Sequence, residues 1–183
     1  MPDKTDEMIV EEVQRGDTQA FGELVSRYEE KIMRYAGKFL SEIDDRKDVV
    51  QEAFIKAYAN IQGFDAKRRF SPWIYRIAHN EFVNALAKKS KIPTISFDPD
   101  LLFPHPVAAE TADGNAARRE MREMLDMHLA NISPKYREPL VLYYFEDMDY
   151  SHIAEVLEIP VSTVGVRLNR GKAILKELMH AHA

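Results

Sequence analysis

Aromatic and basic residues alternate over a short stretch in the first half of the chain, between Gly63 and Asn84. Basic side chains can hold a phosphate backbone, and aromatic rings offer flat surfaces on which unpaired bases stack. This combination favours single-stranded or melted DNA over an intact duplex. The residues of this type are Phe64, Lys67, Arg68, Arg69, Phe70, Trp73, Tyr75, Arg76, His79 and Asn80.

The rings in this stretch have a second explanation, because Phe64, Phe70 and Trp73 could instead close the core where two helices meet. For Trp73 both interpretations, core packing and base contact, remain open. Four further residues fall outside the apolar stripe of their helix, which favours a binding role for them. These four are Tyr75, Arg76, His79 and Asn80.

A second candidate site lies near the C-terminus. A short helix over 150–157 is followed by a break at 158–160 and by a basic helix that begins near Ser162. Two helices joined by a tight turn are typical of a helix-turn-helix, whose second helix enters the major groove of DNA. The groove-facing residues would be Ser162, Thr163, Arg167, Asn169 and Arg170, with Lys172 and Lys176 on phosphates. The alternative is an ordinary helical hairpin whose basic face is only solvated.

The predicted helix over 45–62 has a face of another kind. Opposite its core stripe it carries acidic and amide side chains around a single isoleucine, Ile55. A large apolar residue ringed by polar groups on a well-formed helix resembles the centre of a protein–protein contact, and this acidic face does not suit DNA. Its residues are Asp48, Gln51, Glu52, Ile55, Ala59 and Gln62.

Several chemistries lack the residues that they need. The chain has no cysteine, so disulfides, thiolate zinc sites and cysteine nucleophiles are excluded. The six histidines form no clustered ligand set, and there is no glycine-rich phosphate loop. We therefore expect no enzymatic activity, no metal site and no cofactor. We interpret His180 and His182 as part of a frayed tail rather than as metal ligands.

The charges of the chain are unevenly distributed. The 183 residues carry a formal net charge of −5. Residues 67–91, however, contain seven basic residues and a single acidic one, Glu81. Residues 160–183 contain four basic residues and a single acidic one, Glu177. Two separate basic patches in an acidic chain suggest two contacts with one polyanion, although two solvated helix faces would look the same.

The elements that must position these residues are helices, because apolar residues recur at helical spacing and no strand alternation is evident. We predict helices over about 6–15, 18–40 with Asp17 as N-cap, 45–62, from Ser71-Pro72 onward, and from 117 to the end. Within the last of these segments, Ser133-Pro134 begins another helix, which Pro139 should distort. Residues 92–116 contain four prolines without a sustained period, which indicates an extended linker.

The expected fold is therefore all-α, with two small helical bundles joined by a flexible linker and a helix-turn-helix in the second bundle. No apolar run approaches the roughly 18 residues of a membrane span, and the acidic segment 1–12 is not a signal peptide. We expect a cytoplasmic protein without membrane insertion.

Together these segments resemble the extracytoplasmic-function (ECF) sigma factors, the minimal two-domain initiation factors of bacterial RNA polymerase. Residues 48–65 (DVVQEAFIKAYANIQGFD) resemble the helix that binds core polymerase, and 70–84 (FSPWIYRIAHNEFVN) resemble the segment that binds the −10 promoter element. Residues 133–175 resemble the domain that reads the −35 element. The resemblance spans nearly the whole chain, with the motifs in the expected order.

The resemblance implies a factor that binds core RNA polymerase, directs it to −35 and −10 elements and promotes transcription initiation. It implies domains over 1–92 (region 2) and 117–183 (region 4), joined by a linker over 93–116, and a partner anti-sigma factor. The implied polymerase contacts are Asp48, Gln51, Glu52 and Ile55. The implied contacts to the melted −10 strand, around a loop over 63–72 that holds a flipped base, are Lys67, Arg68, Arg69, Phe70, Trp73, Tyr75, Arg76, His79, Asn80 and Asn84. The implied contacts to duplex DNA at −35 are Ser162, Thr163, Val166, Arg167, Asn169, Arg170 and Lys172.

Two departures from the family pattern bear on the −35 domain. Glu158 stands where members usually have glycine, which predicts a different turn, and Gly165-Val166 replaces a basic residue followed by serine, which predicts a shifted −35 preference. Two alternatives have different functions. A sigma-like decoy that sequesters an anti-sigma factor would not need the basic and aromatic set at 67–84, and a stand-alone helix-turn-helix regulator would not need the acidic helix 45–62.

Overall fold

The computed structural model describes residues 4–90 and 115–180, and every regular element within these residues is a helix. The all-α prediction is therefore confirmed. The chain divides into two compact units, residues 1–94 and 95–183. The predicted linker over 93–116 lies outside the described residues except for its last two positions, and His182 also lies outside them.

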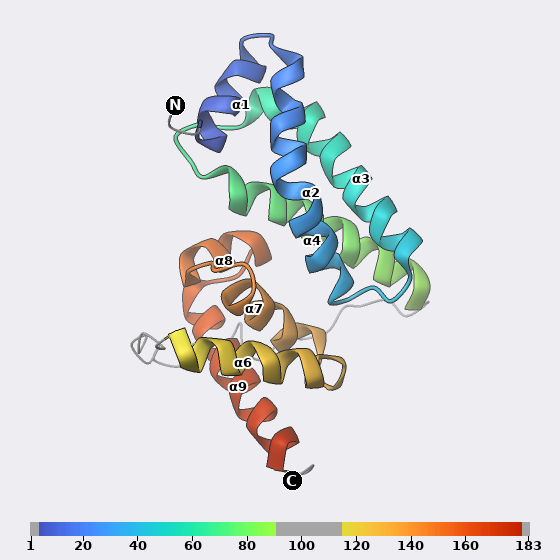
Figure 1. Cartoon of the computed structure of the whole chain (residues 1–183), viewed down its shortest axis with the longest axis vertical. Helices are drawn as coiled ribbons and strands as arrows, with labels where there is room; N and C mark the ends of the chain where they lie inside the picture. The colour runs from blue at the N-terminus through green and yellow to red at the C-terminus, as the bar shows by residue number, and fades with distance from the viewer. Residues whose placement is uncertain (1–3, 91–114, 181–183) are drawn as a thin grey trace. The chain divides into compact units, whose positions relative to one another are not determined.

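In the first unit, α2, α3 and α4 pack against one another, and α1 packs against α2 and against the segment that joins α3 to α4 (Figure 1). Its elements are α1 (Asp6–Gln14), η1 (Thr18–Ala20), α2 (Phe21–Gly37), α3 (Ile43–Asn60), η2 (Ile61–Gly63) and α4 (Phe70–Ser90).

The segment predicted as one helix over 18–40 is instead the short 3-10 helix η1 followed by α2, which ends at Gly37. Asp17 caps the start as predicted, because its Oδ1 accepts hydrogen bonds from the backbone N–H groups of Gln19 and Ala20 at 3.2 and 3.3 Å. Apolar periodicity cannot separate a 3-10 turn from the first turn of an α-helix, because the two place side chains on similar faces.

Helix α4 begins at Phe70, earlier than the predicted cap at Ser71-Pro72. The first N–H group of the helix, that of Phe70, donates to Oε1 of Glu7 at 3.0 Å, so a carboxylate from α1 caps α4. Pro72 then falls within the first turn, where its missing N–H group costs no hydrogen bond. A cap supplied by a distant segment leaves no local signal in the sequence.

Interlocked aromatic rings form much of the core of the first unit. The Tyr35 ring lies edge to face against the rings of Tyr75 and Phe82, with centroids 5.3 and 5.4 Å apart, and Phe39 stacks on Phe82 at 4.7 Å. These contacts join α2 to α4, because Tyr35 lies in α2 and Tyr75 and Phe82 lie in α4. Edge-to-face pairs add about 0.5–1.5 kcal/mol each beyond the burial of their surface.

In the second unit, α9 packs against α6, α7 and α8. As predicted, Ser133 is the N-cap of α7 and Pro134 is its first residue, while the distortion at Pro139 stays a prediction. The elements of this unit are α6 (Asn115–His128), η3 (Leu129–Asn131), α7 (Pro134–Tyr144), α8 (Tyr150–Leu157) and α9 (Val161–His180).

Two arginines of α6 hold the end of α7. The guanidinium groups of Arg118 and Arg122 donate to the carbonyls of Tyr143 and Tyr144, and both pair with the Asp147 carboxylate at 3.1 and 3.0 Å. The last carbonyls of a helix have no partner within the helix, so these cations satisfy them and also oppose the negative end of the helix dipole. These contacts hold α6 to the end of α7 and to the segment that leads into α8.

Candidate functional site

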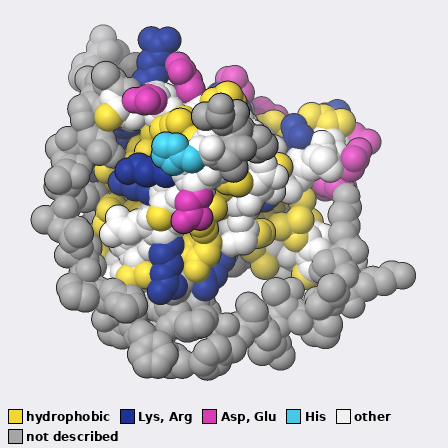
Figure 2. Space-filling view, turned by 90° about the horizontal axis from the view of Figure 1, so that it is seen from below, with side chains coloured by type: hydrophobic (Ala, Val, Ile, Leu, Met, Phe, Trp, Pro, Cys, Tyr) yellow, Lys and Arg dark blue, Asp and Glu magenta, His cyan; other side chains and the backbone are white. Residues whose placement is uncertain are grey.

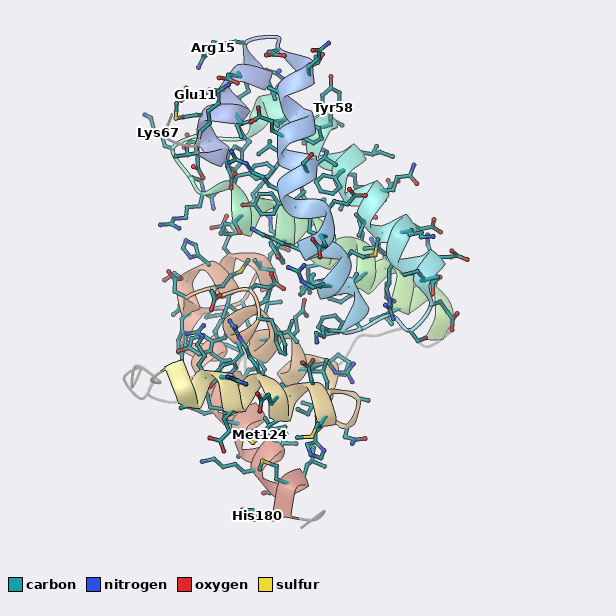
Figure 3. The ribbon with its side chains drawn as sticks, viewed as in Figure 1. Glu11, Arg15, Tyr58, Lys67, Met124 and His180 are labelled. Carbon is teal, nitrogen blue, oxygen red and sulfur yellow. The ribbon has the colours of Figure 1, made fainter. Side chains whose placement is uncertain are left out.

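The first candidate surface is a basic loop, which we define as residues 64–70. Its three consecutive cations, Lys67, Arg68 and Arg69, are all exposed. Asp65 shapes the loop locally, because its Oδ1 accepts the Lys67 N–H at 3.0 Å and its carbonyl accepts the Arg68 N–H at 2.9 Å. Lys67 projects beside α1, and the three cations line a hollow of about 610 Å³ together with residues of α1 and α2 (Figure 3).

The aromatic rings of this stretch are buried, which corrects part of the sequence-based interpretation. Phe70 is fully buried, Tyr75 is 2% exposed and Trp73 is 8% exposed. Trp73 lies against Phe64 and Phe70, with ring centroids 4.8 and 5.6 Å apart. The expectation that Tyr75 lies outside the core is wrong, because Tyr28 and Tyr35 of α2 cover its ring. These rings support the surface from below and do not offer free faces for stacking.

The polar members of the predicted set on α4 are accessible. Arg76 and His79 are half-buried, and Asn80 and Asn84 are exposed. The His79 ring lies edge-on against Phe82, with centroids 5.2 Å apart, which restrains the imidazole. Cations and amide groups are therefore the accessible part of the predicted −10 set, on the loop and on α4.

One ion pair joins α3 to α4 beside these residues. Nζ of Lys56 lies 2.7 Å from Oε1 of Glu81, whose side chain is only 12% exposed, and 3.8 Å from Oε1 of Glu52. The hydrogen bond with Glu81 raises the pKa of Lys56, so the ammonium group stays charged at neutral pH. Lys56, Glu81 and Asn84 line a hollow of about 800 Å³ between the two helices. The lysine therefore neutralises the one carboxylate of the basic stretch 67–91.

The predicted protein-binding face of α3 is exposed throughout. Asp48, Gln51 and Glu52 are exposed, and Ile55 is 53% exposed at their centre. Beside Ile55 an apolar groove of about 680 Å³ lies between α2 and α3, with Phe21, Val25, Phe54 and Tyr58 among its lining residues. The sequence analysis missed this groove and the exposed Tyr58, because apolar residues on two helices do not reveal whether they close against each other.

The helix-turn-helix is formed by α8, the turn 158–160 and α9, as predicted. Asp149 caps α8, accepting the His152 N–H on Oδ1 at 2.8 Å. Glu158 ends α8 with φ 54° and ψ 41°, the left-handed conformation that glycine adopts most easily. The expectation of a different turn is therefore wrong, because Glu158 takes the backbone conformation that a glycine cap would take.

Five of the seven residues predicted to face DNA on α9 are at least partly accessible, and two are not. Asn169 and Arg170 are exposed, and Ser162, Arg167 and Lys172 are half-buried. Thr163 is 1% exposed and Val166 is 7% exposed, so the prediction that they lie open is wrong. Both side chains are short and lie one turn before Arg167 and Arg170, and helical side chains lean toward the N-terminus over the preceding turn. Burial favours a packing role for both residues.

The surface shows no single sign of charge over the face drawn in Figure 2, where basic, acidic and hydrophobic side chains are interspersed. Within residues 4–90 and 115–180, no group of three or more histidine or acidic side chains is placed to hold a metal ion. In the same residues, no helix combines the length and the apolar character that crossing a membrane would need.

Comparison with known families gives two matches in chain order. The model for "Sigma-70 region 2" matches residues 24–92, and the model for "Sigma-70, region 4" matches residues 122–175. Among curated proteins, the ECF RNA polymerase sigma factor SigW of Bacillus subtilis is 32% identical over 92% of this chain and 93% of its own length. The ECF RNA polymerase sigma-E factor of Haemophilus influenzae is also 32% identical, over 94% of each chain.

Two solved structures are similar over most of the chain. CnrH, determined in complex with the cytosolic domain of CnrY, is 26% identical with a TM-score of 0.72, and the match covers 98% of this chain and all of CnrH. The sigma factor RpoE in complex with the anti-sigma factor NepR from Bartonella quintana is 23% identical with a TM-score of 0.62, over 87% of this chain and 96% of RpoE. The second likeness supports the fold alone.

Proposed function

The chain belongs to the family of extracytoplasmic-function RNA polymerase sigma factors. From this premise we propose which of its surfaces binds the polymerase and which bind promoter DNA during transcription initiation. The factor binds core RNA polymerase, directs it to −35 and −10 promoter elements, and captures the melted −10 strand. It acts in the cytoplasm because the polymerase and the promoter DNA are there.

We assign the steps to three segments. Residues 1–92 bind the polymerase and the −10 element, residues 117–183 read the −35 element, and residues 93–116 link them. The polymerase contact is the exposed face of α3 formed by Asp48, Gln51, Glu52 and Ile55. The −35 contact is α9, through the accessible residues of its predicted set, Ser162, Arg167, Asn169, Arg170 and Lys172.

The observation that carries this proposal is the different chemistry of two exposed surfaces of the first unit, which meet at the hollow lined by Glu52 and Asn84. The α3 face is acidic, with an exposed isoleucine at its centre, and suits a protein partner. The loop 64–70 and the accessible face of α4 carry cations and amides and suit a nucleic acid. A factor that must hold a polymerase and a DNA strand at the same time needs two such surfaces of different chemistry.

We further propose an anti-sigma partner that covers the polymerase-binding surface. The similar protein CnrH was determined with the cytosolic domain of a second protein bound to it. The apolar groove beside Ile55 and Tyr58 offers such a partner a place to bury hydrophobic side chains. Occupation of this groove would compete with the polymerase for the same helix.

Transcription in vitro with purified core polymerase on a library of promoter sequences tests the function. We expect the chain to bind core polymerase and to produce transcripts from a subset of promoters that share −35 and −10 sequences. A decoy would bind an anti-sigma factor but support no transcription with core polymerase. A stand-alone helix-turn-helix regulator would bind duplex DNA without any requirement for polymerase.

A further inference from the structure

Helix α1 precedes the region that the sigma-70 region 2 model matches, yet it makes hydrogen bonds to both ends of the basic loop 64–70. Gln14 Nε2 donates to the carbonyls of Ile61 and Phe64 at 2.7 and 2.8 Å. Glu7 Oε1 accepts the N–H of Phe70 at 3.0 Å. One short helix thus holds the backbone where the loop leaves η2 and where it enters α4.

The spacing of Glu7 and Gln14 along α1 allows them to reach the two ends of the basic loop. Glu7 and Gln14 are seven residues apart on α1, which is almost two full turns, so they lie on the same face about 10 Å apart along the axis. The backbone groups that they bind lie at the end of one helical segment and the start of the next. The Ile61 carbonyl also accepts the Phe64 N–H at 3.1 Å. The Phe64 carbonyl and the Phe70 N–H, by contrast, lie where a helical segment ends or begins and so lack a partner within a helix. Gln14 and Glu7 therefore satisfy the Phe64 carbonyl and the Phe70 N–H, which would otherwise need water.

Helix α1 is itself held firmly, so it can act as a support. Asp6 Oδ1 lies 2.7 Å from Nη1 of Arg27, and the Tyr28 hydroxyl donates to Asp6 Oδ2 at 2.5 Å, which ties α1 to α2. Burial and the bond to Asp6 raise the pKa of Tyr28, so this hydroxyl keeps its proton at all ordinary pH values. Ile9 and Val10 on α1 are fully buried.

We propose that Gln14 and Glu7 are positioning residues for capture of the promoter strand. Neither has to touch DNA. They hold the loop in one conformation, so that Lys67, Arg68 and Arg69 are placed before the strand arrives. Three adjacent cations repel one another, and a free loop carrying them would lose conformational entropy each time it bound. This inference rests on the proposed function, because it concerns how the same loop acts in strand capture.

The test compares full-length variants assembled with core polymerase. Gln14→Met and Glu7→Met remove the hydrogen bonds at similar side-chain length, whereas Glu7→Gln keeps an oxygen that can accept the Phe70 N–H. Glu11→Met is the matched control, because Glu11 lies on the same helix and is exposed, with an ion pair only to Arg15 at 2.9 Å among the described residues. Each holoenzyme is titrated with single-stranded non-template oligonucleotides from the promoters that the wild-type holoenzyme transcribes. Core affinity and hydrogen exchange of the Phe70 amide are measured on the same preparations.

We expect Gln14→Met and Glu7→Met to weaken strand capture about tenfold while core affinity changes less than twofold. Glu7→Met should also speed exchange of the Phe70 amide at least tenfold, and Glu7→Gln and Glu11→Met should resemble wild type. Unchanged strand capture in Gln14→Met and Glu7→Met would overturn the proposal. So would an equal loss of core affinity, because the two residues would then only stabilise the whole unit. If the wild-type holoenzyme transcribed no promoter, the proposed function itself would fail, which is a different result.

Discussion

Ile55 is a large apolar side chain that the first unit leaves 53% exposed on α3, where it lines the apolar groove together with Gln51 and Tyr58. A single exposed isoleucine needs no explanation, but this one stands on a helix whose core stripe is already filled by other residues. A partner that covers this side chain would remove its apolar surface from water, which favours binding.

We predict that Ile55→Asp weakens binding to core polymerase about tenfold without reducing the stability of the free chain. An aspartate can stay hydrated on the free surface but must lose water in a protein contact. Ile43→Asp is the matched control, because Ile43 is 51% exposed on the same helix, in its first turn. Affinity measured by fluorescence anisotropy, together with circular dichroism of each variant, distinguishes the outcomes. Equal affinity of Ile55→Asp and wild type would exclude this residue from the interface.

Lys56 acts at the same scale through charge. Its ammonium group neutralises the carboxylate of Glu81. Glu81 is the one acidic residue in the segment 67–91, which also contains seven basic residues. We predict that Lys56→Met lowers the yield of open promoter complexes severalfold, because an unpaired carboxylate beside Asn84 repels the DNA backbone. Adding Glu81→Gln should restore the yield, since it removes the charge that Lys56 normally offsets. Permanganate footprinting of the melted bases measures the yield, and a double variant as defective as Lys56→Met would contradict this role.

At the scale of the elements, two positions in the second unit show how glycine and its absence shape the helix-turn-helix. Glu158 adopts a left-handed conformation without being glycine, and Gly171 lies on α9 against Leu140 and Tyr136 of α7. The first position carries backbone strain, and the second has no room for a side chain. Glu158→Gly and Gly171→Ala should therefore change stability in opposite directions.

We predict that Glu158→Gly stabilises the second unit by up to about 1 kcal/mol. The left-handed conformation costs a residue with a Cβ about 1–2 kcal/mol, and the greater freedom of glycine in the unfolded chain offsets part of this gain. Glu155→Gly, inside α8, is the control and should instead destabilise by about 1 kcal/mol. Urea denaturation followed through amide signals of α8 provides the measurement. A loss of stability in Glu158→Gly would show that the side chain makes a contact worth more than the strain.

Gly171→Ala should destabilise the second unit by about 1–3 kcal/mol, although alanine is the better helix former. A Cβ at this position would lie 2.7 Å from Cδ1 of Leu140, which is fully buried on α7, and 3.3 Å from the carbonyl of Tyr136. Gly22→Ala on α2 is the matched control, because a Cβ there meets no atom of the described chain within 4 Å. Urea denaturation should show Gly22→Ala at least as stable as wild type. A stabilised Gly171→Ala would mean that α7 and α9 can separate at little cost.

For the whole molecule, the net charge of −5 and the small number of accessible cations on each unit imply that neither unit binds DNA strongly without support. A polymerase that holds both units on one promoter makes the second contact intramolecular, at an effective concentration in the millimolar range for a flexible tether. Weak contacts at −35 and −10 then combine into a specific one.

We predict that the free chain binds a duplex promoter at least about a hundredfold more weakly than the holoenzyme does, and that raising the salt from about 50 to 200 mM abolishes the weaker binding first. Fluorescence anisotropy with one labelled promoter duplex measures both affinities, and a duplex with scrambled −35 and −10 elements serves as the control. Tight binding of the free chain to the promoter, with little dependence on salt, would favour the stand-alone helix-turn-helix regulator instead.

Several features of the fold could be predicted from local sequence because they depend on neighbouring residues. The apolar stripe of α3, the proline at the start of α7 and the break after Leu157 follow from spacing and backbone chemistry over a few residues. The same spacing predicts the exposed Ile55, as the one large apolar residue opposite that stripe. Short-range periodicity and capping therefore sufficed for these elements and for the acidic face.

Other features depended on segments that are distant in the sequence. The burial of Tyr75 requires the rings of α2, the start of α4 requires a carboxylate from Glu7, and the need for Gly171 comes from Leu140 on another helix. Hydrophobic pattern assigns a residue to a face of its own helix but does not say which neighbour covers that face or how closely. Packing brings side chains from separate helices together. The burial of the aromatic rings and the hydrogen bonds from Gln14 and Glu7 to the basic loop therefore form only when the chain has folded.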